Sequence, residues 1–360
     1  MAEKQVVMKG NEAMAETSMR AGCRLFSGYP ITPQTEILEY MSWRMPEVGG
    51  TVVQTEDEIA GVYMLMGATA AGARVLSTSA GPGYSLFQEG ISYLVGSDLP
   101  AVLVDVTRIG NALGDISQSQ GDYELVTKGN GHGDTMVPVF TPNSVQEIVD
   151  DTLLAYDMAE KYRHPVVLMY DAAIGQMMEG VTLPEMKEHD IDKYDWTVKG
   201  KKPGEHGRKI TNVSYFCENM YVGYETYLRD KYQQIKDNEQ RWESIKVADA
   251  EVVAVAYGIS SRVCKEAVKN AREQGIKLGL IRPKMVVPFP EKAFEEISEN
   301  CKGLLVVEMS VKGQMVADVA LASRCKYPIY GYLSSYEVPE SDIVIEKTKE
   351  ILENKAKEVF

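Results

Sequence analysis

The sequence predicts an α/β protein made of two doubly wound domains, in which helices cover both faces of a parallel sheet. Residues 1–190 alternate short apolar runs with segments of helical periodicity, and a second alternation of this kind begins near residue 248. The run at 100–106 is almost wholly apolar, as expected for a strand that is covered on both faces. The length of 360 residues also fits about two domains.

Apolar runs in the first domain predict strands at 23–27, 51–54, 74–78, 101–106 and 165–170. Helical periodicity between these runs predicts helices at 9–21, 33–44, 56–71 and 143–161. Because strands and helices alternate, the strands are expected to pair in parallel.

The composition changes between about 190 and 245, where Asp, Lys, Tyr and Glu dominate. A polar, Tyr-rich helix is predicted from about 221 to 246, either facing a partner or forming a plain surface linker. In the last domain we predict strands and helices at 250–257, 259–274, 290–300, 303–308 and 340–357.

Overall composition excludes several classes of protein. The formal net charge of −14 argues against nucleic-acid binding, which needs concentrated Lys and Arg. No apolar run reaches 18 residues, so no membrane span is expected. The N-terminus lacks the basic-then-apolar pattern of a secretory signal, so a cytoplasmic protein is expected.

Metal-ligand patterns are missing from the sequence. Its five Cys include no pair with C-x-x-C spacing, and its four His include no pair at i, i+4. We therefore expect no metal site and no iron–sulfur cluster held by this chain. Scattered cysteines in odd number also fit a reducing compartment.

The most informative loop is Gly28–Pro33, which follows the strand at 23–27. Its two prolines fix two φ angles and make the loop stiff. Thr32 is predicted to cap a helix that begins at Pro33. The loop is either a well-made helix start or a holder for a small polar ligand.

Three acidic residues, Glu56 to Glu58, follow the strand at 51–54 and open a helix rich in Gly and Ala. Acidic residues in a first turn interact favourably with the positive end of the helix, which explains one or two of them. Glycines such as Gly61 and Gly67 destabilise a helix, so close packing is the expected reason for them. A carboxylate at the start of such a helix can be buried and can share a proton with a ligand nitrogen.

Arg108 stands just beyond the strand at 101–106, at the sheet edge where ligands bind in open α/β folds. Its guanidinium either binds a ligand carboxylate or pairs with a surface acid. Ser77–Ser85 looks like a sharp strand-to-helix turn whose free N–H groups are a weaker candidate for anion binding. Gly129–Asp134 reads as a flexible loop in which His132 is a proton carrier or simply exposed.

Taken together, these motifs resemble the α subunit of the 2-oxoacid:ferredoxin oxidoreductases, and the branched-chain 2-oxoisovalerate (3-methyl-2-oxobutanoate) type most of all. The resemblance runs in order over essentially the whole chain. The matching motifs are Gly28–Pro33, Thr55–Ala60, Ala70–Arg74, Ser79–Gly83, Gln88–Gly90, Arg108, Lys128–Asp134, Gly175–Met178, Gly279–Pro283, Pro288–Pro290 and Glu308–Met315.

The resemblance implies a thiamine diphosphate pyrimidine-binding domain at 1–190, a connector at 191–247 and a transketolase C-terminal-like domain at 248–360. Glu58 matches the carboxylate that binds the aminopyrimidine ring and is expected to be catalytic. Thr32 and Arg108 match the positions that hold the substrate. Tyr29 and Pro30 are expected to contact the cofactor beside Glu58.

The implied activity is oxidative decarboxylation of a 2-oxoacid to an acyl-CoA and CO₂, with electrons passed to ferredoxin. Thiamine diphosphate would be shared with a partner, Mg²⁺ and 4Fe–4S clusters would lie on partner subunits, and CoA would be a cosubstrate. The implied partners are a beta subunit with the diphosphate-binding domain, a gamma subunit and a ferredoxin-like delta subunit. This chain has neither the G-D-G pattern of a diphosphate-binding half nor cysteine clusters.

The segment Ile109–Gly114 departs from the Gly-Gly-Pro run that is common in the family after the arginine. The segment carries no cation, and its Ile109, Ala112 and Leu113 are apolar, which favours a branched-chain substrate over 2-oxoglutarate. Two alternatives remain at this point: the beta subunit of a lipoate-linked 2-oxoacid dehydrogenase, and a non-catalytic scaffold paralogue. The loop at 28–33 and the Gly131–Asp134 element argue against the first, and intact Glu58, Thr32 and Arg108 argue against the second.

Overall fold

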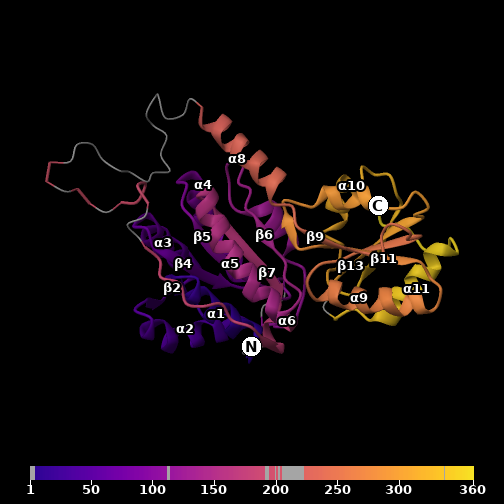
Figure 1. The fold of residues 1–360 in the computed structure, drawn as a ribbon, viewed down its shortest axis with the longest axis horizontal. Coiled ribbons are helices and arrows are strands. Elements are labelled where there is room, and N and C mark those ends of the chain that lie inside the picture. The colour runs from indigo at the N-terminus through magenta and orange to yellow at the C-terminus, as the bar shows by residue number, and fades with distance from the viewer. Residues whose placement is uncertain are drawn as a thin grey trace.

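The computed structural model describes residues 5–111, 114–190, 194–198, 200–201, 203–204, 223–335 and 337–360. Figure 1 shows two α/β units side by side, the N-terminal one in indigo to magenta and the C-terminal one in orange to yellow. Each unit is built on a sheet whose central strands are parallel. The predicted fold class is therefore confirmed.

The sheet of the N-terminal unit has its strands parallel except for one at an edge. In spatial order its strands are β12 (Met285–Val287), β6 (Val139–Phe140), β7 (Pro165–Asp171), β5 (Ala101–Thr107), β4 (Arg74–Ser79), β2 (Cys23–Gly28) and β3 (Thr51–Gln54). The antiparallel edge strand β12 comes from a segment far along the chain, within the range predicted for the last domain. One strand from the later part of the chain thus completes the sheet of the N-terminal unit.

Helices cover both faces of this sheet. One face carries α1 (Gly10–Arg20), α2 (Thr35–Glu47) and α5 (Val145–Tyr162), and the other carries α3 (Glu58–Ala70) and α4 (Gly81–Gly96). Residues of each strand alternate between two apolar clusters, so that Leu103 packs on the α3–α4 side and Val102 and Val104 on the other. This alternation buries both faces, as the apolar run at 100–106 predicts.

Smaller elements complete the N-terminal unit. A two-stranded antiparallel sheet joins β1 (Val6–Lys9) to β8 (Met178–Val181), next to the short helix α6 (Ala172–Gln176). A π-helical turn, Leu125–Gly129, leads from the loop after β5 towards β6. The sequence patterns did not predict these elements, because each is too short to show a period.

The C-terminal unit has a five-stranded sheet. Its strands in spatial order are β14 (Ile329–Leu333), β13 (Gly303–Glu308), β10 (Val252–Val255), β11 (Leu278–Pro283) and β9 (Trp242–Ile245). Its helices are α9 (Gly258–Glu273), α10 (Val316–Ala322), α11 (Ser341–Leu352) and the 3-10 helix η3 (Glu291–Glu296). β9 runs antiparallel to β11, and the other pairs are parallel.

Helix α8 (Tyr224–Asn238) lies along the outside of the N-terminal unit (Figure 1). Lys231 on its inner side pairs with Asp98, and Tyr232 donates to the carbonyl of Asp134. The helix predicted at 221–246 is therefore correct only in its middle, because 242–245 forms β9. The aromatic and β-branched residues at these positions pack at a sheet edge that the local pattern does not reveal.

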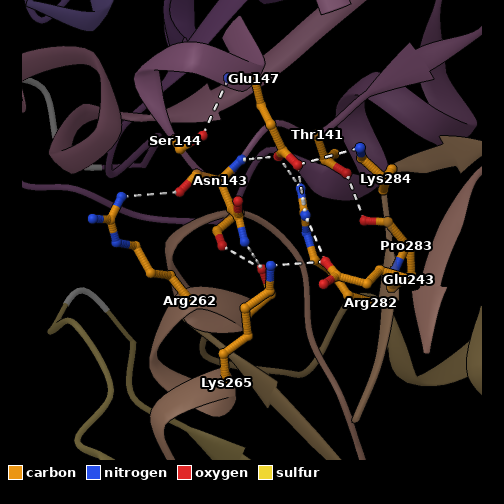
Figure 2. Close-up of polar contacts among 12 residues, drawn as sticks. Thr141, Asn143, Ser144, Glu147, Glu243, Arg262, Lys265, Arg282, Pro283 and Lys284 are labelled. Atoms are coloured by element: carbon orange, nitrogen blue, oxygen red, sulfur yellow. Dashed lines mark hydrogen bonds and ion pairs between the residues drawn. The ribbon is translucent and has the colours of Figure 1, made fainter. Parts of the chain in front are cut away.

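A buried arginine, Arg282 on β11, joins the two units (Figure 2). Its Nη1 lies 2.9 Å from Glu147 Oε1 on α5 and 3.1 Å from Glu243 Oε2 on β9, and its Nη2 also pairs with Glu147. Burial acts to raise the pKa of Glu147, but hydrogen bonds from Arg282 and its charge lower it to about 2. This network ties α5 to the C-terminal sheet.

Candidate active site

The carboxyl ends of β2, β3, β4 and β5 meet at one edge of the N-terminal sheet, because these strands are parallel neighbours. Thr32 follows β2, Glu58 follows β3, and Arg108 follows β5 directly. The first turn of α4, which follows β4, lies between them. Residues from four separate segments are thus brought together at the edge where α/β folds bind ligands.

Glu58 is the first residue of α3 and its side chain is buried, with 4% exposed. Asp57 is the N-cap of the helix and accepts a hydrogen bond from Ala60 N at 2.7 Å. Ser79 Oγ, at the end of β4, donates to Glu58 Oε1 at 3.1 Å. Within the described part of the chain the other oxygen, Oε2, makes no hydrogen bond, so it can accept one from a ligand.

Gly83 on α4 is the residue that makes room for this carboxylate. A Cβ at this position would lie 2.0 Å from Glu58 Oε1 and 2.2 Å from Ser79 Oγ. A methyl group there would displace the Glu58 carboxylate and the Ser79 hydroxyl from these positions, so the glycine permits the close approach of α4 to Glu58 as observed.

The packing of α3 corrects one sequence interpretation. Close packing does join α3 to α4, because a Cβ at Gly90 of α4 would lie 2.3 Å from Val62 on α3. Gly67, however, is exposed, and a Cβ there would meet nothing within 4 Å. Close packing within the described chain therefore does not account for Gly67.

Arg108 is also buried, with 5% exposed. Its Nη1 donates to the carbonyl of Thr32 at 2.8 Å, and its buried Nε has no hydrogen-bond partner. No carboxylate among the described residues lies within ion-pair distance of this guanidinium. A buried cation without a hydrogen-bonded anion is unfavourable, so Arg108 is disposed to bind an anionic ligand.

The loop Gly28–Pro33 is held in place by the side chain of Gln34, which is fully buried. Its Nε2 donates to the carbonyl of Tyr29 at 2.8 Å, and Thr78 Oγ1 donates to its Oε1 at 2.7 Å. Tyr29 is partly exposed and Pro30 half-buried, so both side chains border the surface of the site.

The prediction that Thr32 caps a helix is wrong. Helix α2 begins at Thr35 with Gln34 as its N-cap, and Thr32 lies inside the preceding turn, which is closed by a hydrogen bond from Gln34 N to the carbonyl of Ile31. Thr32 instead offers its carbonyl to Arg108, and its side chain is exposed at the site.

Two buried carboxyl groups were missed by the sequence analysis. Asp105 lies on β5, and Asp122 lies on the loop that returns to the same edge. Gly81 N, at the start of α4, donates to Asp105 Oδ1 at 3.2 Å. The free N–H groups expected at this turn thus serve an internal carboxyl. Asp105 falls within a run that reads as plain apolar strand, so only its charge could have drawn attention to it.

The loop Gly129–Asp134 is anchored at its first half, contrary to a wholly flexible reading. Asn130 is buried, accepts a hydrogen bond from Tyr84 Oη at 3.1 Å and donates to the carbonyl of Val126. Gln88 Oε1 accepts from Gly131 N. His132 is exposed and its ring lies edge-on to Tyr93, away from the carboxyl edge described above.

Among the described residues there is no group of three or more His, Cys, Asp or Glu side chains that could hold a metal ion. The helices resolved in these segments include none that is long and apolar enough to cross a membrane.

Two protein-family models match the chain. The model described as pyruvate flavodoxin/ferredoxin oxidoreductase, thiamine diphosphate-binding, matches residues 16–249. The model described as pyruvate:ferredoxin oxidoreductase core domain II matches residues 250–337.

Curated relatives are similar over most of the chain. The ketoisovalerate oxidoreductase subunit VorB of Methanothermobacter marburgensis is 45% identical over 320 residues, covering 89% of this chain and 90% of that protein. The 2-oxoglutarate synthase subunit KorA of Methanocaldococcus jannaschii is 38% identical over 334 residues, covering 87% of this chain and 90% of that protein.

Solved structures share the fold. A 2-oxoglutarate:ferredoxin oxidoreductase from Magnetococcus marinus, with 2-oxoglutarate, coenzyme A and succinyl-CoA bound, has a TM-score of 0.86 at 24% identity. The similarity covers 97% of this chain and 66% of that one. A split-gene transketolase has a TM-score of 0.59 at 14% identity, covering 97% and 99%.

Proposed function

Because the chain belongs to the 2-oxoacid:ferredoxin oxidoreductases, as a subunit resembling the ketoisovalerate type, we propose that its carboxyl-edge site oxidatively decarboxylates a branched-chain 2-oxoacid. The products would be an acyl-CoA and CO₂, with the electrons passed to ferredoxin. Because the chain belongs to this family, it is not the beta subunit of a lipoate-linked 2-oxoacid dehydrogenase.

The observation that carries the proposal is the unpaired guanidinium of Arg108. It is buried, its Nη1 is held by the carbonyl of Thr32, and no carboxylate of the described chain satisfies it. A 2-oxoacid has a carboxylate that matches the planar fork of an arginine. Thr32 would donate a hydrogen bond from its exposed hydroxyl to the keto or carboxylate oxygens.

The residues around Glu58 fit a thiamine diphosphate cofactor. Oε1 is held by Ser79 and Oε2 is free to share a proton with an aminopyrimidine ring nitrogen, while Gly83 leaves space for the carboxylate. Tyr29 and Pro30 would contact the cofactor from the adjoining loop. Thiamine diphosphate, when bound, supplies a nucleophilic carbon that adds to the keto group and accepts the electron pair left by CO₂.

The surface beside Glu58 supports a site completed by a second chain. Four large apolar side chains on α3 and α4 are exposed next to it: Ile59, Tyr63, Met64 and Leu86. Exposed apolar patches of this kind mark protein interfaces. We assign this face to the partner subunit that carries the diphosphate-binding domain, with Mg²⁺ and the 4Fe–4S clusters on partner subunits.

Substrate choice is assigned to the segment Ile109–Gly114. Ile109 is half-buried and follows Arg108, whereas Ala112 and Leu113 lie outside the described residues. The segment contains no cation to pair with the second carboxylate of 2-oxoglutarate. A branched aliphatic side chain would gain about 0.8 kcal/mol for each methylene group that it buries there.

The test is a panel of 2-oxoacids with the assembled complex. kcat/KM should be highest for 2-oxoisovalerate, lower for pyruvate and lowest for 2-oxoglutarate, and Arg108→Met should raise KM for each of them. A higher kcat/KM for 2-oxoglutarate would reject the branched-chain assignment, and an unchanged KM in Arg108→Met would reject the role of Arg108. Calorimetry of the isolated chain should show no tight thiamine diphosphate binding until the partner is added.

A further inference from the structure

Gln120, on the loop that follows β5, is bonded across the boundary between the two units. It is buried, with 1% exposed, and its backbone N–H donates to the carbonyl of Met309 at 2.7 Å. Its Oε1 accepts hydrogen bonds from Met309 N at 2.9 Å and from Ser260 Oγ at 2.8 Å. Its Nε2 donates to the carbonyl of Tyr257 at 3.0 Å. One side chain of the N-terminal unit thus makes three hydrogen bonds to the C-terminal unit.

The partners of Gln120 lie at the carboxyl edge of the C-terminal sheet. Tyr257 and Ser260 lie at the start of α9, which follows β10, and Met309 follows β13. β10 is the first parallel strand of this sheet, with β11 on one side and β13 on the other, so the chain changes direction there. Open α/β sheets bind ligands at such a point, and in this sheet the amide of Gln120 fills it.

Gly258 allows this close approach. It has a φ of +52°, and a Cβ there would lie 3.1 Å from Gln120 Nε2. A side chain at this position would be strained in its backbone and would crowd the amide. The start of α9 is thus shaped to receive Gln120.

The residues just before Gln120 pair with the strand end that carries Arg108. Three contacts join residues 107–109 to residues 117–119: the antiparallel bridge of Arg108 with Gln118, the hydrogen bond from Ile109 N to the carbonyl of Ser117 at 3.1 Å, and that from Thr107 Oγ1 to the carbonyl of Ser119. We call residues 117–120 the return segment. It is bonded to the backbone of Arg108 at one end and to the C-terminal unit at the other.

The place of the Arg108 guanidinium depends on this backbone. Among the described residues the guanidinium makes one hydrogen bond, to the carbonyl of Thr32, so few side-chain contacts fix it. A group that binds a substrate must be held precisely, because a displacement of about 1 Å can cost about 100-fold in rate. The return segment supplies the support that the side chain itself lacks.

We propose that Gln120 is a positioning residue for substrate binding: from the carboxyl edge of the C-terminal sheet it fixes the return segment and, through it, Arg108. The inference rests on the proposed function, because it takes Arg108 as the group that binds the substrate carboxylate. Glu58 does not depend on Gln120, since Ser79 and α4 hold its carboxylate in place. Loss of Gln120 therefore weakens substrate binding more than it slows the reaction of bound substrate.

The first experiment is Gln120→Met in the assembled complex. Methionine has a similar length but makes none of the three side-chain hydrogen bonds. KM for 2-oxoisovalerate should rise by about tenfold or more, while kcat changes by less than about threefold. An unchanged KM, or a fall in kcat alone, would overturn the proposal. If Gln120→Met does not assemble, Gln120→Asn keeps the amide but shortens it by one methylene group, and its KM should rise by about threefold or more.

The matched control is Asn143→Leu, which removes a second buried amide from the same boundary. The side chain of Asn143 is hydrogen-bonded to Ser261 Oγ at 3.1 Å, but it lies beside Glu147 and not beside Arg108 (Figure 2). KM in this variant should stay within about twofold of the wild type. A rise equal to that in Gln120→Met would show a general loosening of the boundary and would overturn the positioning role.

Hydrogen exchange tests the support of Arg108 without relying on activity. The amide of Ile109, which is bonded to the return segment, should exchange about tenfold faster in Gln120→Met and at the wild-type rate in Asn143→Leu. Equal exchange in Gln120→Met and the wild type would contradict the proposal.

A double variant separates this proposal from the proposed function. Arg108→Met combined with Gln120→Met should have the KM of Arg108→Met alone, because Gln120 acts through the arginine. Increases in KM that multiply would overturn the positioning role. A raised KM in Arg108→Met with an unchanged KM in Gln120→Met would reject the positioning role alone, whereas an unchanged KM in Arg108→Met would reject the substrate-binding arginine itself.

Discussion

Two buried arginines in this chain stand in opposite electrostatic situations. Arg282, between the two units, has 0% of its side chain exposed and makes ion pairs with Glu147 and Glu243. Arg108, at the carboxyl edge of the first sheet, makes one hydrogen bond to a backbone carbonyl, and its Nε is unpartnered. An arginine whose partners are all internal holds the structure together, whereas one with spare donors is available to a ligand.

The carboxyl groups near these arginines show the same contrast. Direct hydrogen bonds to Arg282 outweigh burial and lower the pKa of Glu147 to about 2. Burial outweighs the more distant charge of Arg108 and raises the pKa of Asp122 to about 7. The negative charge of Glu147 is therefore stabilised between the two units, whereas that of Asp122 is poorly compensated near Arg108. Poorly compensated buried charges of this kind are typical of functional sites.

The largest expected effect is at the carboxyl edge. Glu58→Gln removes the proton-accepting oxygen and should lower turnover of the assembled complex by about 100- to 10,000-fold, while leaving assembly intact. The matched control is Glu56→Gln, an exposed residue two positions earlier. Turnover of the control should stay within about twofold of the wild type. Near-normal turnover in Glu58→Gln would reject the catalytic assignment.

The second prediction compares how much the loss of each arginine lowers the stability of the chain. Arg282→Met removes the buried partner of Glu147, leaves it only the more exposed Lys284 as an ion pair, and should lower the free energy of unfolding by about 3 kcal/mol. Arg108→Met removes a cation that has no carboxylate partner in the described chain and should change it by less than about 1 kcal/mol. Denaturant titration of both variants measures the difference.

An exposed ion pair serves as the control for this comparison of the two arginine variants. Lys312 pairs with Glu124 at the surface, so Lys312→Met should cost at most about 1 kcal/mol. If Arg108→Met destabilised the chain as much as Arg282→Met, the contrast between a structural and a ligand-binding arginine would be lost.

The third prediction compares two glycines near Glu58. In Gly83→Ala the new methyl group would collide with Glu58 Oε1, so the carboxylate must move and turnover should fall by about 100-fold. Gly67→Ala adds a methyl group to an open helix surface and should stabilise α3 by about 0.5–1 kcal/mol. Wild-type turnover in Gly83→Ala would show that the position of Glu58 is not set by α4.

The last prediction concerns the pH dependence of stability. As the pH rises, the contribution of Glu147 to stability increases, whereas that of Asp122 decreases. The folded pKa of Glu147 is depressed, so its contribution is present above pH 4.5 and is lost as the pH falls through about 2. Glu147→Gln should therefore be less stable than the wild type at pH 7, by about 1–2 kcal/mol, and the deficit should shrink on acidification.

For Asp122 the folded pKa is raised, so stability falls as the pH rises from about 4 through about 7. Asp122→Asn should gain on the wild type over this range. Thermal unfolding from pH 3 to pH 8 checks both variants. A deficit in Glu147→Gln that grows on acidification would contradict the pairing seen between Arg282 and Glu147.

Local sequence patterns were sufficient for most of the N-terminal unit. The strands predicted at 23–27, 51–54, 74–78, 101–106 and 165–170 all form, with ends that differ by at most one residue. The patterns also placed Glu58 at the start of a helix and Arg108 at the end of a strand. These features depend on residues within one helical turn or one strand. Over such short segments the spacing of apolar residues along the sequence indicates which side chains are buried.

The tertiary structure alone decided which groups meet. Asp105 looks like part of an apolar strand until the loop carrying Asp122 returns to its side, and Gly83 acquires its role only because α4 passes over Glu58. The same holds for β12, which joins the first sheet from residues 285–287. These contacts join residues far apart along the chain, and their free energy comes from burial and charge in the folded state, which no local pattern contains.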